Sequence, residues 1–255
     1  MAGNRPEEKV AVPIAHQSWR HVSFLHWRYP ADVIQGLLPD GLTPDLVDGS
    51  AWVGLTPFRV EGLRLPGTPA LPVVSQFPET NLRTYVVDAD GTDGLWFLSL
   101  DVESAVMVVA ARLGLDIPYF PAEMNVEAGD TVRYESRRVG QPAASHRIEV
   151  RPGAPLGDDV SERDAALLGR WRAFSEVAGR LVQVPVEHEP WPVHAATLVE
   201  LEESVTTAAG LPAPTGDPLV HYSPGVDARL GPPRRAASAT AGSTGTPGPG
   251  HRSTR

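Results

Sequence analysis

The sequence contains no cysteine and only one lysine. Without cysteine, the chain can form no disulfide, no thiolate nucleophile and no zinc or iron–sulfur site with Cys ligands. The absence of cysteine also fits a reducing compartment. The one lysine, Lys9, lies in a polar N-terminal stretch without hydrophobic periodicity, and every other residue counted as Lys or Arg is an arginine.

Long apolar runs and a secretory leader are missing as well. The longest apolar run covers residues 105–111, whereas a membrane-spanning helix needs about 20 apolar residues. The N-terminus has no apolar segment followed by a small-residue cleavage site. We therefore expect a cytoplasmic protein without a membrane partner.

The charge and the motifs narrow the function further. The net charge of −9, from 31 acidic and 22 basic residues, disfavours nucleic acid and anionic lipid as partners. No Gly-x-Gly-x-x-Gly follows a predicted strand, and neither a P-loop nor a Gly-x-Ser-x-Gly elbow is present. We predict no nucleotide cofactor, no other cofactor and no serine-hydrolase activity.

The composition along the chain predicts one domain with a tail at each end. Hydrophobic residues make up 42% of the sequence, enough for a sizeable core at this length. Residues 1–13 are polar, and residues 231–255 are rich in Gly, Ser, Thr, Pro and Ala, a composition typical of disordered segments. We therefore expect a single domain over residues 14–230 between two disordered tails.

Short strands dominate this predicted domain. Residues 17–28 alternate, with Trp19, His21 and Ser23 on one face and Val22 and Phe24 on the other. Residues 51–60 are strand-like but broken at Pro57, and residues 81–87 and 95–100 flank a turn-rich segment that predicts a hairpin. Further strands are expected at 131–137, 146–151 and 180–186.

A few helices are expected around these strands. The pattern predicts helices over residues 30–38, 104–113 and 204–209. Another begins at Ser161 with a capping box and carries Leu167, Leu168, Trp171 and Phe174 on one face. Many strands with few helices predict an α+β, mostly β fold with a closed sheet.

Histidines do not predict a metal site. His16, His21 and His26 are spaced by five residues, which places successive members on opposite faces of one strand. His188 and His194 flank a proline-rich loop without a third ligand to complete a site. We interpret all five as structural or hydrogen-bonding residues and predict no bound metal.

Several segments in a characteristic order resemble the YqjF-like family of uncharacterised bacterial proteins. The resemblance runs from about residue 18 to residue 230. It is carried by HWRYP (26–30), LPDGL (38–42), AWVGLTPFR (51–59), FPETNLRTYV (77–86), LWFLSLD (95–101), GDTVRY (129–134), PWP (190–192) and HYSPGVD (221–227).

This family resembles acetoacetate decarboxylase, which implies a closed antiparallel barrel with a few short helices packed around it and a small-molecule cavity. In that enzyme a lysine with a lowered pKa attacks a ketone. The corresponding stretch here is ARLGLDIPYFP (111–121), where Tyr119 and Phe120 stand in place of two lysines. Neither side chain can form an imine, and Lys9 is not held in a pocket. Decarboxylation through a Schiff base is therefore excluded.

The resemblance and the strand pattern nominate six ligand-binding residues. Arg28 and Glu79 stand near positions that carry an active-site arginine and glutamate in the decarboxylase. Alternation places Glu79, Asn81 and Arg83 on one face. Tyr119 replaces a lysine, and Tyr222 precedes a turn at a barrel mouth. Glu79 and Tyr119 are also the catalytic candidates. Purely structural roles remain open for these residues: Glu79 and Arg83 could form a structural ion pair or face solvent, Tyr119 could be a core tyrosine, and Tyr222 could cap the barrel.

Two functions fit these residues. One is an enzyme, lyase- or hydrolase-like and without an imine, that acts on a carbonyl- or carboxylate-bearing metabolite. The other is a non-catalytic module that binds or senses a small ligand, and a barrel filled with side chains remains a third possibility. A small molecule is the expected partner. The sequence leaves the oligomeric state open, a homo-oligomer included.

Overall fold

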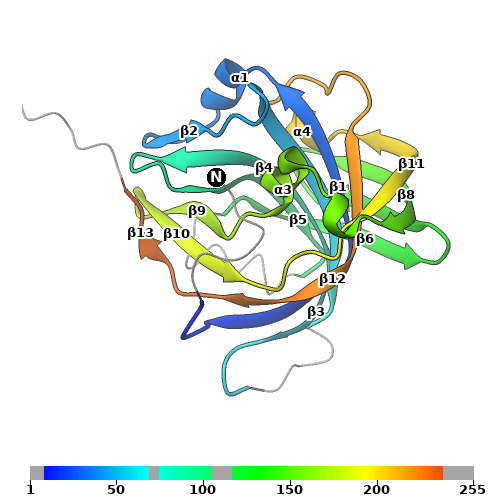
Figure 1. Ribbon diagram of the computed structural model, residues 1–255, viewed down its shortest axis with the longest axis horizontal. Coiled ribbons are helices and arrows are strands. Elements are labelled where there is room, and N and C mark those ends of the chain that lie inside the picture. Colours follow the sequence, from blue (N-terminus) through cyan, green and yellow to red (C-terminus); the bar gives the residue numbers. More distant parts are fainter. Residues whose placement is uncertain (1–8, 69–74, 105–116, 238–255) are drawn as a thin grey trace, which may run out of the picture.

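The computed structural model describes residues 9–68, 75–104 and 117–237. Strands account for most of them (Figure 1). The strands are β1 (Ala15–Tyr29), β2 (Leu42–Pro44), β3 (Ala51–Arg64), β4 (Phe77–Asp88), β5 (Asp93–Val102), β6 (Tyr119–Ala128), β7 (Val132–Arg138), β8 (Ser145–Pro155), β9 (Arg172–Val177), β10 (Arg180–Glu187), β11 (His194–Glu203), β12 (Leu219–Leu230) and β13 (Arg234–Arg235). The helices are α1 (Ala31–Gln35), α3 (Glu162–Leu168) and α4 (Val205–Ala208), with a 3₁₀ turn at Gly157–Asp159.

Nine strands form a closed barrel, in agreement with the predicted fold class. Its strands follow the order β1, β3, β4, β5, β6, β7, β8, β11 and β12, and β12 pairs again with β1. Every pairing in this ring is antiparallel except β5 with β6, which is parallel. This ring is called the nine-strand barrel below.

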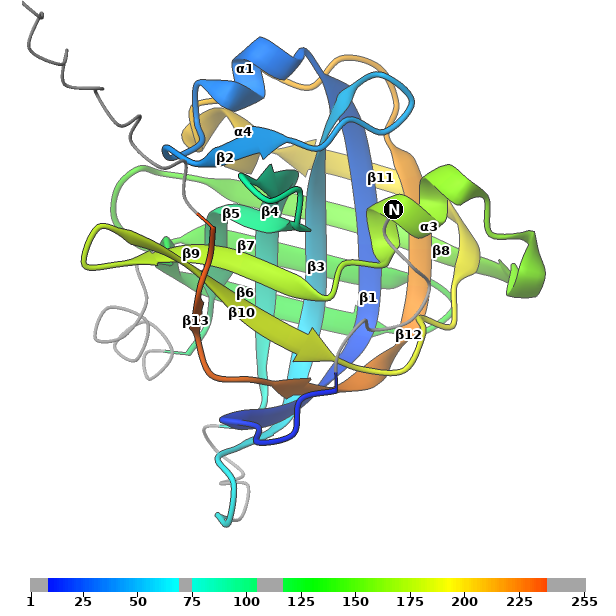
Figure 2. The ribbon, with the colours of Figure 1, turned by 60° about the vertical axis from the view of Figure 1, so that its left-hand side comes forward.

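A second ring shares one wall with this barrel. Strand β5 also pairs in parallel with β9, β9 pairs with β10, and β10 pairs with β12. Strands β12, β1, β3, β4 and β5 therefore belong to both rings, and β9 and β10 complete a seven-strand ring on their other face. In Figure 2 the β9–β10 hairpin crosses in front of β3, while β7 and β8 pass behind it.

The nine-strand barrel is filled by side chains. All nine strands contribute to one hydrophobic cluster, which includes the fully buried residues Leu25, Leu55, Leu82 and Ile148. Helices α1 and α4 add Ile34 and Val205 to this cluster. Because this interior is packed, the expected small-molecule cavity does not lie in the nine-strand barrel but in the seven-strand ring.

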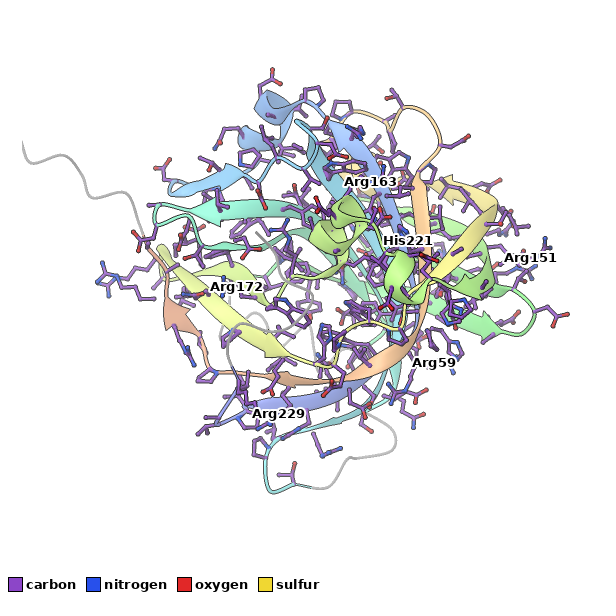
Figure 3. The ribbon with its side chains drawn as sticks, viewed as in Figure 1. Arg59, Arg151, Arg163, Arg172, His221 and Arg229 are labelled. Atoms are coloured by element: carbon purple, nitrogen blue, oxygen red, sulfur yellow. The ribbon has the colours of Figure 1, made fainter. Side chains whose placement is uncertain are left out.

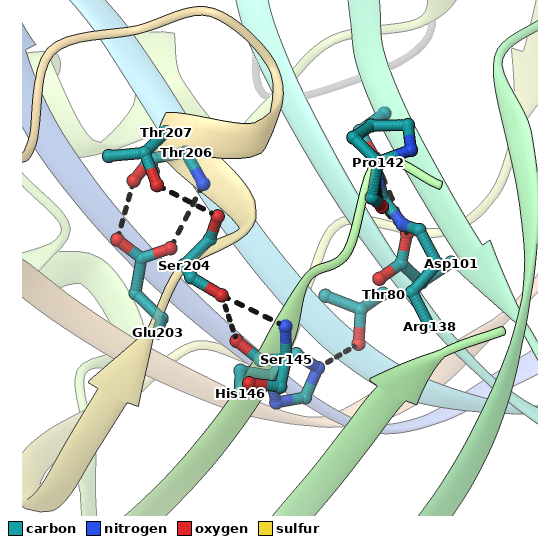
Figure 4. A network of polar contacts seen from close by, with 11 residues as sticks. Thr80, Asp101, Arg138, Pro142, Ser145, His146, Glu203, Ser204, Thr206 and Thr207 are labelled. Atoms are coloured by element: carbon teal, nitrogen blue, oxygen red, sulfur yellow. Dashed lines mark hydrogen bonds and ion pairs between the residues drawn. The ribbon is translucent and has the colours of Figure 1, made fainter. Parts of the chain in front are cut away.

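Polar side chains also occur inside the nine-strand barrel (Figure 4). The guanidinium of Arg138 donates to Asp101 Oδ1 at 2.5 Å, and both side chains are fully buried. Arg138 Nη2 also donates to Ser99 Oγ at 2.7 Å. Thr80 Oγ1 lies 2.9 Å from His146 Nε2 nearby. These groups bind one another, although Asp101 Oδ2 and His146 Nδ1 have no hydrogen-bond partner among the described residues.

A β-bulge in β1 corrects the predicted alternation. The register of β1 against β3 shifts between Arg20 and Leu25, and His21 has a positive φ of 50°. Across the strand pair, Gly225 of β12 has φ 132°, and a Cβ there would lie 2.0 Å from the carbonyl oxygen of Trp19. The bulge moves Trp19 to the same face as Val22 and Phe24, whereas strict alternation predicted opposite faces.

Other local predictions met mixed outcomes. The β4–β5 hairpin is confirmed, with Val87 paired to Asp93, and Ser161 caps α3 by accepting from the backbone N–H of Asp164. Helix α3 ends at Leu168, however, so Trp171 and Phe174 do not extend it, and Phe174 belongs to β9. Strand β3 continues through the predicted break at Pro57. Most of the predicted helix over residues 104–113 lies outside the described residues.

Residues on either side of the predicted domain, 14–230, pack against it. Val10 is buried, its N–H donates to Glu187 at 2.6 Å, and its carbonyl oxygen accepts from Arg229. At the other end, β13 pairs with β10 and Ala236 is buried. Within the described ranges, no helix has the length and apolar character needed to cross a membrane.

Candidate functional site

The seven-strand ring encloses a cavity of about 150 Å³. All seven strands contribute to its wall, together with the C-terminal end of α3 and the loop after β10. Most of the lining is aromatic or aliphatic, including Trp19, Phe24, Phe58, Phe97, Phe174 and Trp191. A cavity of this size accommodates a small organic molecule.

Strand β4 supplies the polar part of the wall. Glu79, Asn81 and Arg83 line the cavity, each is at least 93% buried, and they occupy alternate positions of one strand. Alternate residues of a strand point to the same face and lie roughly 7 Å apart. Thr80 and Leu82 between them face the nine-strand barrel, where Thr80 contacts His146. The predicted polar stripe therefore faces the cavity.

Tyr119, the first residue of β6, meets Glu79 in this cavity. The two side chains are hydrogen-bonded; Glu79 is buried and Tyr119 is partly buried. Burial raises the pKa of Glu79 to about 8, and the hydrogen bond from Tyr119 partly opposes this shift. Burial and the neighbouring Glu79 raise the pKa of Tyr119 well above its usual value. At neutral pH the Glu79 carboxyl is thus mostly protonated and able to donate a proton.

The adjacent residue Phe120 points to the other side of the wall. The Arg138 guanidinium stacks over its ring at 3.9 Å in the nine-strand barrel. The two positions that correspond to the lysine pair of the decarboxylase thus serve different purposes. One faces the cavity, and the other covers a buried ion pair.

Arg83 brings a positive charge into the cavity wall. Its guanidinium lies 5.4 Å from the ring centroid of Phe24 and donates to the hydroxyl of Tyr85. Its Nε is buried without a hydrogen-bond partner. In the described part of the chain, no carboxylate forms an ion pair with Arg83, so the predicted structural Glu79–Arg83 pair does not form. Buried charges are normally paired, and this guanidinium is therefore suited to bind an anionic group.

A second arginine of the cavity differs in this respect. Arg170 donates to Asp45 at 2.6 Å and to Asp93 at 2.8 Å, and it stacks over the Tyr85 ring. Its charge is therefore neutralised by the protein. Arg170 supports the wall, whereas Arg83 carries a charge that a ligand can neutralise.

His188 is a cavity residue that the sequence interpretation did not nominate. Its ring packs 4.7 Å from that of Trp191 and 5.6 Å from that of Trp19, and Nδ1 lies 2.6 Å from the carbonyl oxygen of Glu189. Burial and the charge of Arg83 lower the pKa of His188 to about 4, and the hydrogen bond with the carbonyl oxygen of Glu189 partly opposes this shift. The imidazole ring of His188 is therefore neutral near pH 7. In the sequence, only the proline-rich segment around His188 could have indicated that it lines the cavity.

Two small polar side chains of the lining, Thr56 and Ser175, also escaped prediction as site residues. Thr56 Oγ1 and Ser175 Oγ, together with Asn81 Oδ1 from the predicted set, are buried and have no hydrogen-bond partner. Thr56 lies directly opposite Asn81 in the β3–β4 pairing. Only the register of β3 against β4 reveals this neighbour, and the sequence does not specify that register.

Two nominated residues lie outside the cavity. Arg28 is half exposed, contacts Asp48 at 3.6 Å and stacks over Trp52 at 4.7 Å. Tyr222 belongs to the core cluster of the nine-strand barrel, and its hydroxyl lies 3.0 Å from His21 Nδ1. Neither lines the cavity, because Arg28 is directed to solvent and Tyr222 faces the barrel core.

Two buried polar contacts lie between the cavity and α3. The hydroxyl of Tyr85 lies 2.6 Å from His26 Nε2, and burial keeps the pKa of His26 well below its usual value. His221 lies on β12 beside α3 (Figure 3), with Nε2 at 3.6 Å from Asp164. In the residues that the structure describes, no three His, Asp or Glu side chains gather in a way that could hold a metal ion.

The fold is that of acetoacetate-decarboxylase-like proteins. An acetoacetate decarboxylase-like enzyme from Sphingomonas wittichii RW1 superposes with a TM-score of 0.62 at 15% identity, covering 91% of this chain and 96% of that one. The acetoacetate decarboxylase of Legionella pneumophila gives 0.62 at 14% identity over 89% and 88%. The enduracididine biosynthesis enzyme MppR, complexed with pyruvate, gives 0.58 at 15% identity over 91% and 93%.

Sequence comparison identifies the family. Residues 16–227 match the DUF2071 model, described as an uncharacterized conserved protein. The uncharacterized protein YqjF of Bacillus subtilis (strain 168) is 33% identical over 235 residues, which cover 90% of this chain and 97% of that protein. The chain belongs to this family, as its sequence motifs predicted.

Proposed function

We propose that the cavity binds a small carboxylate- or carbonyl-bearing metabolite and transforms it by acid–base catalysis without an imine. One observation carries this proposal: Glu79, hydrogen-bonded to Tyr119, shares a cavity with the guanidinium of Arg83, which forms no ion pair with any described residue. An acid with a pKa near the working pH is suited to proton transfer. A guanidinium binds carboxylates through its planar fork of N–H donors.

Each side chain then has a defined role. Arg83 holds the carboxylate of the substrate, and the aromatic wall excludes water from the reacting group. Protonated Glu79 donates its proton to a carbonyl or leaving oxygen. Tyr119 donates a hydrogen bond to the carboxylate that forms on Glu79, which stabilises the ionised state. The reaction class that fits is a lyase- or hydrolase-type step.

The related structures support this substrate class. MppR shares the fold, and one structure of it is described as complexed with pyruvate, a small 2-oxo carboxylate. Two other structures are described as a decarboxylase and a decarboxylase-like enzyme. The chemistry must differ from amine catalysis here, because the sole lysine of this chain, Lys9, is exposed and outside the cavity.

Ligand-dependent melting followed by a turnover assay tests the proposal. Small carboxylates, 2-oxo acids and their uncharged amides are screened for a rise in Tm, and each hit is assayed for product. We expect carboxylates to stabilise the wild type and Arg83→Gln to abolish the stabilisation. Glu79→Gln should keep binding and lose turnover. Arg28→Gln, outside the cavity, is the control and should match the wild type.

A non-catalytic binding or sensing role is the second candidate. It is favoured by the loss of the amine nucleophile at position 119. Stabilisation by carboxylates that depends on Arg83, with no product from any hit, would support this role and overturn catalysis. Stabilisation by none of the carboxylates, or equal stabilisation of the Arg83→Gln variant, would overturn both candidates. Cytoplasmic location and a homo-oligomeric state stay predictions from the sequence.

A further inference from the structure

Thr56 and Asn81 form a polar pair in the middle of the cavity wall. They lie directly opposite each other in the antiparallel β3–β4 pairing, a position in which two Cβ atoms are about 5 Å apart. Both line the cavity, with exposed fractions of 2% and 6%. Among the residues that the structure describes, neither Thr56 Oγ1 nor Asn81 Oδ1 has a hydrogen-bond partner.

Their place in the strand order relates them to the two ends of the proposed site. Along β4, Asn81 lies between Glu79 and Arg83 on the same face. Opposite Arg83, β3 carries Gly54, and opposite Glu79 it carries Phe58. A substrate whose carboxylate is bound by Arg83 and whose reacting group is near Glu79 therefore passes the Thr56–Asn81 pair.

The hydrogen-bonding needs of this pair are specific. A buried polar atom without a partner costs about 1–3 kcal/mol. The oxygen of Asn81 requires a donor, and the hydroxyl of Thr56 requires an acceptor for its proton. A ligand hydroxyl group supplies both at one atom. A ligand methylene supplies neither, and it would displace any bridging water without replacing its hydrogen bonds.

The remaining wall restricts the rest of the substrate. Phe24, Phe58 and Phe174 and their aliphatic neighbours offer apolar surface around the polar stripe. The volume of about 150 Å³ suits a compact apolar group. A long chain or a second charge would find neither space nor a partner, because Arg170 is already neutralised by Asp45 and Asp93.

We propose that the substrate is a compact hydroxylated monocarboxylate, whose hydroxyl group is bound by Thr56 and Asn81. This inference rests on the proposed function, since it assumes that Arg83 binds the carboxylate. It names two specificity-determining residues and adds to the substrate a functional group that acid–base catalysis alone does not require.

Matched probes separate this inference from the proposed function. Binding of 4-methylpentanoate, its 2-hydroxy and 3-hydroxy derivatives, and 4-methylpentanol is measured by calorimetry on the full chain. We expect at least one hydroxy acid to bind about 10-fold more tightly than the parent acid, the worth of roughly one good hydrogen bond to a buried partner. The alcohol should not bind, since it lacks the carboxylate.

The variants Thr56→Val and Asn81→Leu then locate the preference. In each variant, the hydroxy acid should bind at most about 2-fold more tightly than the parent acid. Arg28→Gln should keep the wild-type preference for the hydroxy acid. If all three acids bind equally and require Arg83, the hydroxyl inference fails and the proposed function stands. If the hydroxyl preference survives in both variants, the assigned residues are wrong. If no acid binds, both proposals fail together.

Discussion

The hydroxyl of Tyr119 donates a hydrogen bond to the buried carboxyl group of Glu79 within the cavity wall. The two residues come from β4 and β6, which are not neighbours in the sheet, because both pair with β5. The contact joins an acid of raised pKa to a donor that stabilises its ionised form. Its properties can be tested without knowing the substrate.

The raised pKa of Glu79 predicts a pH-dependent stability difference. Below about pH 4.5, Glu79 is protonated in the folded and unfolded chain alike. Between about pH 4.5 and 8 only the unfolded chain ionises, so the free energy of unfolding falls by about 1.4 kcal/mol per pH unit. Glu79→Gln removes this loss. Urea unfolding at pH 5, 7 and 9 should show the variant gaining on the wild type by on the order of 4 kcal/mol, with no further gain above pH 8.

The same experiment on Tyr119→Phe tests the hydrogen bond. Without the phenolic donor, the pKa of Glu79 rises further, so the loss of stability should continue above pH 8. A constant difference between Glu79→Gln and the wild type at all pH values would contradict the assignment of a buried, protonated carboxyl group.

Two buried arginines of the cavity should respond in opposite ways to replacement. Arg170→Met removes the arginine that Asp45 and Asp93 share and leaves Asp93 only its contact with Arg172, and breaking such a buried pair costs about 3–5 kcal/mol. Arg83→Met removes a charge that no carboxylate of the described chain neutralises. We expect the unliganded variant to be as stable as the wild type or more stable, by about 1 kcal/mol. Urea unfolding of both variants measures this difference in stability. A large loss of stability in Arg83→Met would show that another group of the protein already neutralises the charge of Arg83.

The sequence predicted the family, the mostly β architecture and half of the site. Alternation along residues 79–83 was sufficient to place Glu79, Asn81 and Arg83 on one face, since a regular strand has a period of two. Position 119 came from the family resemblance. Which face meets the cavity could not be predicted, because both faces of β4 are buried, one in each ring.

The misplacements have local physical causes. The bulge at His21 inserts one residue in β1 against β3 and reverses the faces beyond it, which periodicity alone cannot detect. Arg28 follows Trp27 of the barrel core and points to solvent. The second ring arises from the pairing of β5 with β9. That contact joins residues about 80 positions apart, and no local pattern predicts it.

The close approach of β12 to β1 makes Gly225 a sensitive position. A Cβ there would lie 2.0 Å from the carbonyl oxygen of Trp19, and the φ of 132° is unfavourable for any other residue. Gly225→Ala should lower the free energy of unfolding by more than about 3 kcal/mol, because the backbone must move. Gly91→Ala is the matched control, since Gly91 also has positive φ but no heavy atom near its Cβ position. It should lose only about 1 kcal/mol.

The buried pair of Asp101 and Arg138 gives the last test, because it lies in the nine-strand barrel and not at the cavity. Asp101→Asn keeps the shape of the side chain but leaves the Arg138 charge without a carboxylate. A buried charge that loses its partner costs about 3–5 kcal/mol, whereas replacing both partners by apolar residues is often neutral. Asp101→Asn should therefore be much less stable in urea than the double variant Asp101→Leu, Arg138→Met. Glu123→Gln, in an exposed pair with Arg137, should change stability by less than about 1 kcal/mol. If Asp101→Asn changed stability as little as Glu123→Gln, the Asp101–Arg138 pair would have to be open to water. The conclusion that the nine-strand barrel is packed and only the seven-strand ring is hollow would then be wrong.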